Sequence, residues 1–436
     1  MLYKALNAPL TVHLEIDTEC NQICRHCYNF WRARQPRLRI RLSEPLSIRM
    51  ADQLQKYNVF HVILTGGEPF MNAKIMFLLM DELTKRSITF SLNSNVTLLT
   101  PELAAIARQK GLYSVLTSFL SYDPAMHNFL SSTKGSFDRT IRGIKIAQDA
   151  GLNVAANMVV SRYNLSHVQR TGMFLGELGI TTFSATRVIP PRQCDAALLE
   201  ELTLGNDDIR SIVSQLLFLK EQGTHIDSLV PYPACFFDSK ESWAPFRSRT
   251  CSAGKTSVVL AANGMVRACP HHEKEYGSLQ LEELGTIWSH MDEWRDGSQL
   301  PNICKSCSLF AACGGGCRMA SRDGSVCGDD VIADAQKQKI DISRPSSPIT
   351  LTGTTQLRVK VKCRFRKDDV MGVINTGGLQ NTLVAPETLD VFKGIHDEGS
   401  TFTPDSLRTT HSIIMPEEQY LQFLDQLVTK NVLERV

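Results

Sequence analysis

The chain has 436 residues and a mass of 48.7 kDa, which is too long for one ordinary domain, so two or three domains are expected. A hydrophobic content of 43% and a charged content of 21% are typical of a globular protein with a sizeable core. The net charge of +2 gives no electrostatic reason to expect nucleic acid or an anionic membrane as partner.

The N-terminal residues lack the apolar segment of a signal peptide, and no run is long enough to span a bilayer. The odd number of cysteines, 13, argues against a disulfide framework. We therefore expect a cytoplasmic protein whose thiols are reduced or bind metal.

The first half of the chain alternates between two hydrophobic patterns. Short apolar segments rich in β-branched or aromatic residues predict strands at 10–16, 60–64, 88–92, 113–117, 153–160 and 181–187. Helical patterns lie between them at 47–57, 73–86, 101–110, 137–150 and 166–178. Six strand–helix units in this order predict a parallel sheet with right-handed crossovers.

Chemically suggestive segments follow the first three predicted strands. Cys20, Cys24 and Cys27 follow the first with C-x3-C-x2-C spacing, GGEP at 66–69 follows the second, and Ser94-Asn95 follows the third. Three thiolates can hold three irons of a 4Fe–4S cube and leave the fourth iron open to bind another molecule. Chemistry in a parallel barrel lies at the C-terminal ends of the strands, so these segments are expected to meet there.

A second cysteine pattern occupies the region after residue 250. It reads C-x12-G-x4-C, then C-x2-C-x5-C-x3-C, then one more cysteine after a gap; its members are Cys251, Cys269, Cys304, Cys307, Cys313, Cys317 and Cys327. A structural zinc knuckle is the rival interpretation, because C-x2-C is also a zinc spacing. Cys194 and Cys363 are interpreted as small buried hydrophobes, and His271-His272 as a solvated loop.

The third part begins after a Pro/Ser-rich linker. Strand-like runs at 357–365 and 370–375, with a Gly-Gly turn at 377–378, precede helical patterns at 386–395, 404–409 and 416–431. A small sheet followed by three short helices is a winged-helix outline. Such domains often bind DNA, but the last helix carries Glu417, Glu418 and Asp425 against few cations, which argues against that role.

The first triplet and the GGEP sequence resemble the signature of radical S-adenosylmethionine (SAM) enzymes. The resemblance implies a partial (β/α)6 barrel in which the open iron chelates the methionine part of SAM. An electron from the cluster then cleaves the sulfonium, and the 5′-deoxyadenosyl radical abstracts a hydrogen from the substrate. In this resemblance His26 replaces the usual aromatic residue, the glycines let backbone approach a ligand, and Glu68 accepts from the SAM ammonium.

The same resemblance places Ser94-Asn95 as a ribose-contacting turn. The full set implied for SAM binding is His26, Gly66, Gly67, Glu68, Pro69, Ser94, Asn95, Ser118, Arg139 and Asn157. For Ser118, Arg139 and Asn157, a role in the core or on a helix surface is equally open. A Cys194 thiol near the substrate would also be able to donate hydrogen to a carbon radical, and no residue is assigned as a catalytic base.

The seven-cysteine pattern is similar to the SPASM extension, which carries auxiliary 4Fe–4S clusters in peptide- and protein-modifying radical SAM enzymes. The resemblance assigns one cluster to Cys304, Cys307, Cys313 and Cys327. It assigns the other to Cys251, Cys269 and Cys317, with Cys235 as our choice of fourth ligand. Three 4Fe–4S clusters are thus implied, two of them auxiliary, and these accept the surplus electron of a net oxidation.

The C-terminal outline resembles the PqqD-like recognition element, which binds the leader of a precursor peptide as an added strand. The implied domains are 1–230 (radical SAM barrel), 231–335 (SPASM), 336–350 (linker) and 351–436 (peptide recognition). The implied function is maturation of a ribosomally synthesised precursor peptide through an oxidative side-chain cross-link: carbon–carbon, carbon–oxygen or thioether. The expected partners are that peptide and a low-potential electron donor such as flavodoxin or ferredoxin, with no nucleic acid and no membrane.

Other functions share parts of this pattern. A sulfatase-maturase-like protein oxidase, a peptide epimerase and a small-molecule or cofactor-biosynthesis enzyme all fit the cysteines, but the first and third need no leader-binding domain. An iron–sulfur regulator that binds DNA is the alternative that is not an enzyme. The GGEP sequence and the barrel pattern argue against it, and SAM cleavage without DNA would exclude it.

Overall fold

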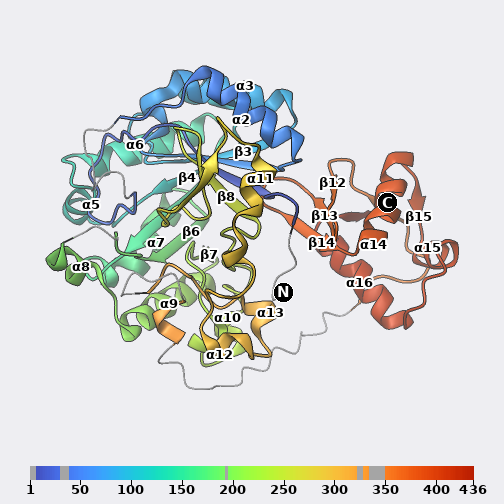
Figure 1. The fold of residues 1–436 in the computed structure, drawn as a ribbon. Helices are drawn as coiled ribbons and strands as arrows, with labels where there is room; N and C mark the ends of the chain where they lie inside the picture. The colour runs from blue at the N-terminus through green and yellow to red at the C-terminus, as the bar shows by residue number, and fades with distance from the viewer. Residues whose placement is uncertain (1–5, 30–38, 192–194, 322–327, 333–348) are drawn as a thin grey trace.

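The computed structural model describes residues 6–29, 39–191, 195–321, 328–332 and 349–436. Figure 1 shows a large α/β part and, beside it, a smaller part formed by the C-terminal residues. Cys194, Cys327 and most of the predicted linker lie outside the described residues. No helix in the described ranges is both long enough and apolar enough to cross a membrane.

Seven parallel strands form the centre of the large part, adjacent in chain order from β1 to β7. They are β1 Thr11–Glu15, β2 His61–Thr65, β3 Thr89–Ser94, β4 Ser114–Ser118, β5 Asn153–Val160, β6 Thr182–Arg187 and β7 His225–Asp227. The six predicted strands and their parallel order are confirmed. β7 is additional, and its three residues are too few to give a sequence signal.

Helices alternate with these strands around the outside of the sheet (Figure 1). They are α2 Glu44–Lys56, α3 Ala73–Lys85, α4 Pro101–Gln109, α5 Pro124–Ser131, α6 Ser136–Asp149, α7 Val168–Glu177, α8 Ala196–Leu202 and α9 Asn206–Glu221, with the short helices η1 Pro69–Asn72 and η2 Leu165–His167. The five predicted helices are confirmed, and α5, α8 and α9 are additional.

The two faces of the sheet differ in polarity. On β1, Val12 and Leu14 are completely buried in the apolar core shared with the helices. The alternate positions are polar: His13 and Glu15 share the other face. On that face the His61 ring hydrogen-bonds the Thr89 hydroxyl at 2.8 Å and the Ser91 hydroxyl at 3.0 Å. The inner face of the sheet is therefore suited to a polar ligand.

The region after residue 250 continues the same sheet. Strands β8 Ser257–Leu260, β9 Met265–Arg267 and β10 Glu275–Ser278 extend it beyond β1, with β8 parallel to β1, to make ten strands. The described short helices between residues 234 and 332 are η3 Ala234–Phe236, α10 Lys240–Trp243, α11 Leu284–Ser289, η4 Asp292–Trp294, α12 Asn302–Lys305, α13 Phe310–Cys313 and η5 Asp330–Ile332. The second cysteine pattern is thus built directly onto the barrel.

The C-terminal part contains two small antiparallel sheets, β12-β13-β14 and β15-β11-β16, and three helices. Its elements are β11 Leu357–Val359, β12 Arg364–Lys367, β13 Gly372–Asn375, β14 Asn381–Val384, α14 Pro386–Glu398, β15 Thr401–Phe402, α15 Pro404–Thr410, α16 Glu417–Thr429 and β16 Leu433–Arg435. The single strand predicted at 357–365 is wrong, because a turn closed by the Cys363 amide on the Lys360 carbonyl divides it between the two sheets. Cys363 is buried as expected.

This C-terminal part contacts the barrel through Arg366. The guanidinium donates to the carbonyls of Ala8 at 2.8 Å and Pro9 at 2.9 Å, and pairs with Asp368 at 3.0 Å. Arg364 reaches the carbonyl of Phe60 at 3.3 Å. These carbonyls precede β1 and β2, so the C-terminal part docks at the N-terminal ends of the barrel strands.

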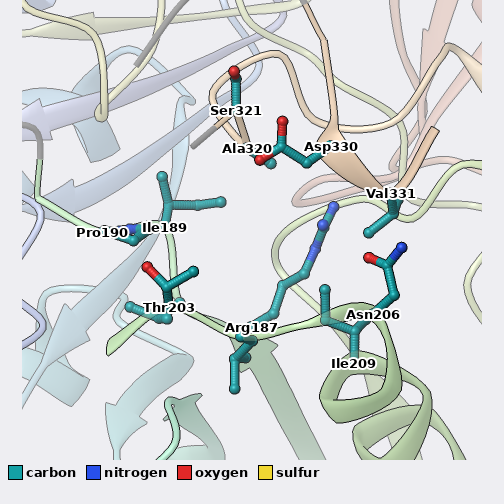
Figure 2. A pocket seen from close by; sticks show the side chains of 12 residues that line it. Arg187, Ile189, Pro190, Thr203, Asn206, Ile209, Ala320, Ser321, Asp330 and Val331 are labelled. Atoms are coloured by element: carbon teal, nitrogen blue, oxygen red, sulfur yellow. The ribbon is translucent and has the colours of Figure 1, made fainter. Parts of the chain in front are cut away.

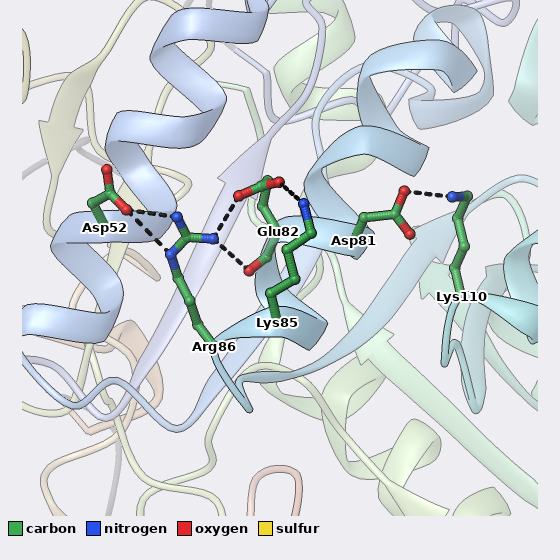
Figure 3. A network of polar contacts seen from close by, with 6 residues as sticks. All are labelled: Asp52, Asp81, Glu82, Lys85, Arg86 and Lys110. Carbon is green, nitrogen blue, oxygen red and sulfur yellow. Dashed lines mark hydrogen bonds and ion pairs between the residues drawn. The ribbon is translucent and has the colours of Figure 1, made fainter.

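Charged pairs link neighbouring helices on the outside of the barrel (Figure 3). Arg86 joins Glu82 of α3 and Asp52 of α2, each at 2.6 Å, and Lys110 joins Asp81 at 2.5 Å. Exposed pairs of this kind contribute only about 0–1 kcal/mol each. The buried apolar layer beneath them is therefore the main stabilising element.

Substitution by alanine is expected to have opposite effects on stability at two helical glycines. A Cβ on Gly143 in α6 would lie 2.1 Å from the Val96 carbonyl oxygen, whereas one on Gly176 in α7 would meet nothing within 4 Å. Gly143→Ala is expected to destabilise by about 1–3 kcal/mol through overpacking. Gly176→Ala is expected to stabilise by about 0.5–1 kcal/mol through helix propensity. Denaturant unfolding of both variants measures this, and equal effects would contradict it.

Candidate functional site

The loop with the first three cysteines is held by the end of α5 and the start of α6. The Ile23 amide donates to the Ser131 carbonyl at 3.3 Å, and the Arg25 amide donates to the Leu130 carbonyl at 3.0 Å. The Gln22 side chain donates to the Ser136 hydroxyl at 2.7 Å, at the start of α6. Because backbone and side-chain contacts both fix the loop, its thiols are positioned before any ligand binds.

The GGEP segment crosses the chain just before Cys20. The Gly67 amide donates to the Asp17 carbonyl and the Glu68 amide donates to the Glu19 carbonyl, both at 2.7 Å. A Cβ on Gly67 would lie 1.8 Å from the Glu19 oxygen, and Gly66 has a φ of +135°. From the sequence, we expected these glycines to let the backbone approach a ligand. In the structure they permit the close approach of two protein segments.

Glu68 connects this crossing to the end of β3. Its carboxylate accepts from the Ser94 hydroxyl at 2.7 Å, the Asn95 amide at 2.9 Å and the Phe70 amide at 3.1 Å. The last of these bonds caps η1, which begins at Pro69. Burial raises the pKa of Glu68, and the three hydrogen bonds oppose that shift. A carboxylate has about four acceptor positions, so it retains capacity for one further donor.

Asn95 completes the convergence of the three segments. Its side-chain amide donates to the Asn21 side chain at 2.8 Å and lies 3.8 Å from the Cys20 sulfur. The Gln22 amide also points at that sulfur, at 3.4 Å. The structure thus brings together the segments that follow β1, β2 and β3, as strand topology led us to expect.

The other three candidate SAM residues are placed differently. Ser118, the last residue of β4, pairs with Asn157 in the middle of β5, and the Asn157 side chain accepts from the Thr186 hydroxyl at 2.6 Å. Arg139 lies on α6 and donates to the Lys134 carbonyl at 3.0 Å. Ser118 and Asn157 therefore lie on the same rim of the sheet as Glu68. The side chain of Arg139 instead contacts the segment that precedes α6.

The thiol loop fits an iron–sulfur cluster by its donor chemistry. Burial lowers the pKa of His26 to about 4, so its ring is neutral, and its buried Nδ1 has no hydrogen-bond partner among the residues that the structure describes. N–H groups directed at the Cys20 sulfur suit a thiolate that bears metal. Within the described ranges, no three His, Cys, Asp or Glu side chains converge on a single-ion site. The fit therefore rests on these donors and on the spacing of the thiols.

A buried ion pair attaches the second cysteine region to β1. Arg267 of β9 pairs with Glu15 of β1, and the same guanidinium donates to the carbonyls of Pro270 and His272. Tyr28, next to Cys27, stacks on His271 with ring centroids 4.3 Å apart. The interpretation of His271-His272 as a solvated loop is wrong, since His272 is buried. This contact brings the Cys27 and Cys269 segments together.

A second buried pair lies at the end of β6. Arg187 donates to Asp329 at 2.8 Å and to the Pro231 carbonyl at 3.0 Å. Asp329 also accepts from the Cys317 amide at 3.0 Å. The sequence analysis missed both buried pairs. Their only signal was a charged residue inside or at the end of an apolar strand.

The described cysteines between residues 235 and 317 form two groups. The Cys317 thiol lies within electrostatic reach of Cys251 and Cys269, two members of its expected ligand set. Cys235, the fourth member expected in that set, packs against the apolar cluster that contains Cys304. The cysteines in the described ranges are thiols rather than disulfides.

A small cavity of about 40 Å³ lies beside β6 (Figure 2). Its lining comes from Arg187 to Pro190, from the segment between α8 and α9, from the start of α9, and from residues on either side of 322–327. None of these residues belongs to the Cys20 loop or to the GGEP segment. The volume suits a few water molecules, so this cavity is not a candidate for the reacting centre.

Comparison with protein families matches residues 15–175 to the radical SAM superfamily and residues 251–308 to the SPASM iron–sulfur cluster-binding domain. The chain is 27% identical over 327 residues to mycofactocin maturase MftC of Mycolicibacterium smegmatis, covering 73% of this chain and 80% of that protein. It is 23% identical over 320 residues to the AdoMet-dependent heme synthase of Nitratidesulfovibrio vulgaris, covering 70% and 86%. It is 26% identical to the subtilosin biosynthesis protein AlbA of Bacillus subtilis, covering 62% and 56%.

Solved structures share the fold. The structure of anSMEcpe with bound AdoMet and Cp18Cys peptide matches with a TM-score of 0.60 and 17% identity, over 75% of this chain and 94% of that one. Streptococcus suis SuiB matches with a TM-score of 0.55 and 17% identity, over 72% and 74%. The family matches and the convergent Cys20, Glu68 and Asn95 segments show an enzyme with a radical SAM domain at residues 15–175 and a SPASM iron–sulfur domain at residues 251–308.

Proposed function

We propose that this enzyme matures a ribosomally synthesised precursor peptide by forming an oxidative cross-link between side chains. The observation that carries the proposal is the combination of the Cys20–Glu68–Asn95 site with a separate C-terminal part that has an open sheet edge. Similarity to the mycofactocin maturase MftC and to the bacteriocin subtilosin biosynthesis protein AlbA supports it. A haem synthase is also similar, so the small-molecule alternative is tested below.

The residues of the barrel would bind and orient SAM. Cys20, Cys24 and Cys27 would hold the cluster that supplies one-electron cleavage of SAM when both are bound. Glu68 would accept from the SAM ammonium with its remaining acceptor position. Ser118 and Asn157, which lie on the same rim, would orient the rest of the ligand.

The second cysteine region would supply electron acceptors. A cross-link removes two hydrogen atoms from the peptide: one leaves as a hydrogen atom, and the other leaves as a proton and an electron. The described thiols that would hold the accepting clusters are Cys235, Cys251, Cys269, Cys304, Cys307, Cys313 and Cys317. A low-potential donor such as flavodoxin or ferredoxin would return electrons to the first cluster.

The C-terminal part would hold the leader segment of the peptide. β14 pairs with β13 alone among the described strands, so its other edge is open. An extended peptide adds to such an edge through backbone hydrogen bonds, with side-chain contacts giving specificity. Leu383 on β14 is 50% exposed, and Leu379 before it is 52% exposed, which provides apolar contacts at this edge.

The function is tested first by anaerobic assay of the full chain with strong reductant, with and without a candidate precursor peptide. About twelve irons per chain are expected for three clusters, together with 5′-deoxyadenosine. A peptide lighter by two hydrogens supports the cross-link. An unchanged mass with deuterium gained from solvent indicates epimerisation, and no change in any peptide with turnover of a small molecule overturns the peptide assignment.

Glu68→Gln is expected to weaken SAM binding by about 10- to 100-fold, because a hydrogen bond to a charged group contributes about 1.5–3 kcal/mol. Titration of SAM into the reduced, iron-loaded protein measures the affinity. Iron content should stay at the parent value, since Glu68 is no ligand. Glu82→Gln, in the surface network of Figure 3, is the control and should bind SAM normally. Equal affinity in Glu68→Gln and the parent would contradict the assignment.

Leu383→Asp is expected to weaken leader-peptide binding by about tenfold or more, because a charge replaces an apolar contact at the strand edge. Ile414→Asp is the matched control: Ile414 is fully exposed in the same part of the chain but lies between α15 and α16. Fluorescence anisotropy with a labelled leader peptide measures both affinities. Uncoupled SAM cleavage should be unaffected in either variant. A loss confined to Ile414→Asp would place the leader elsewhere.

A further inference from the structure

Cys235 lies in η3, and η3 packs against the second group of cysteines. The amide of Ala234, the residue before it, donates to the Cys313 sulfur at 3.1 Å. η3 also contacts η5, which carries Val331 and Ile332. A hydrogen bond and a helix contact therefore hold the backbone of residues 234–236 beside Cys313.

The side chain of Cys235 points into the same group. It packs against a small apolar cluster formed by Leu300, Cys304, Phe310 and Ile332. Its electrostatic partners are the thiols of Cys313, Cys304 and Cys307. Cys317, by contrast, has Cys251 and Cys269 as its thiol partners. The described thiols between residues 235 and 317 thus separate into a set of four and a set of three.

Glycines next to Cys313 make this approach possible. A Cβ on Gly316 would lie 3.1 Å from the Pro233 ring, and one on Gly315 would lie 3.6 Å from the Cys304 sulfur. Both residues have positive φ, as does Gly314. The three-glycine run therefore folds tightly enough for the 233–235 segment to reach Cys304 and Cys313.

We propose that Cys235 is the fourth thiolate ligand of the auxiliary cluster held by Cys304, Cys307 and Cys313. Four thiolates complete the coordination of a 4Fe–4S cube. This cluster then has no open iron, and its role is electron transfer. The set of Cys251, Cys269 and Cys317 does not include Cys235. The inference rests on the proposed function only in requiring that the chain carries iron–sulfur clusters.

The test compares ligand sets by iron and sulfide analysis of anaerobically reconstituted full-length variants, with electron paramagnetic resonance of the oxidised protein. Cys235→Ala alone should lower iron by about one to four atoms per chain, through a 3Fe–4S cluster or loss of the cluster. Cys363→Ala is the matched control, because Cys363 is a buried thiol in the C-terminal part and should leave iron unchanged. Circular dichroism checks that each variant folds.

Two combined backgrounds decide which cluster Cys235 serves. With Cys304, Cys307 and Cys313 all replaced by alanine, adding Cys235→Ala should remove no further iron. With Cys251, Cys269 and Cys317 replaced instead, adding Cys235→Ala should remove about one to four more irons. The opposite pattern overturns the assignment. So does an iron loss caused by Cys327→Ala and not by Cys235→Ala, since Cys327 is the ligand implied by family resemblance.

Failure of this inference can be distinguished from failure of the proposed function. A parent protein that carries iron and cleaves SAM, with a Cys235→Ala variant of equal iron content and spectrum, overturns the ligand assignment alone. A parent protein that retains no iron after reconstitution overturns both.

Discussion

The arrangement of the site depends on the crossing of two backbone segments, 17–19 and 66–68. Their two hydrogen bonds of 2.7 Å continue the pairing of β1 and β2 past the ends of these strands. Only glycine at 67 leaves space for the Glu19 carbonyl. The crossing fixes Cys20 on one side and Glu68 on the other, and Glu68 then fixes the Ser94-Asn95 turn. A side chain at this crossing would displace both the thiol loop and the carboxylate.

Two buried ion pairs extend this organisation to the second cysteine region. Glu15–Arg267 lies next to the loop of Cys269, and Arg187–Asp329 lies next to Cys317. Each joins a barrel strand to a cysteine segment. Breaking a buried pair by removing one partner typically costs about 3–5 kcal/mol, whereas a hydrophobic replacement of both is often neutral. The main effect of these two ion pairs is therefore to fix the positions of the cysteine segments relative to the barrel strands.

The sequence predicted the local elements well and the long-range contacts poorly. Apolar periodicity located β1 to β6, and the order of these strands brought Cys20, Glu68 and Asn95 to one rim. The pairing of β8 with β1 left no local signal, because a four-residue strand is defined by its distant partner. The turn at 360–363 that separates β11 from β12 gave no sequence signal, because the alternation of apolar and polar residues continues through it. Likewise, the spacing of cysteines along the sequence does not show which thiols lie beside Cys235, because the tertiary fold determines which residues are its neighbours.

The docking of the C-terminal part by Arg366 sets a length requirement for any peptide held there. The carbonyls of Ala8, Pro9 and Phe60 mark the strand ends opposite to the thiol loop. A five-residue strand such as β1 spans about 17 Å at roughly 3.3 Å per residue, and a peptide must also pass around the helices. A substrate anchored at β14 would need a spacer of on the order of ten residues or more before its modified side chain. The length of peptide between the anchored segment and the modified residue would then determine which position is modified, together with the type of that residue.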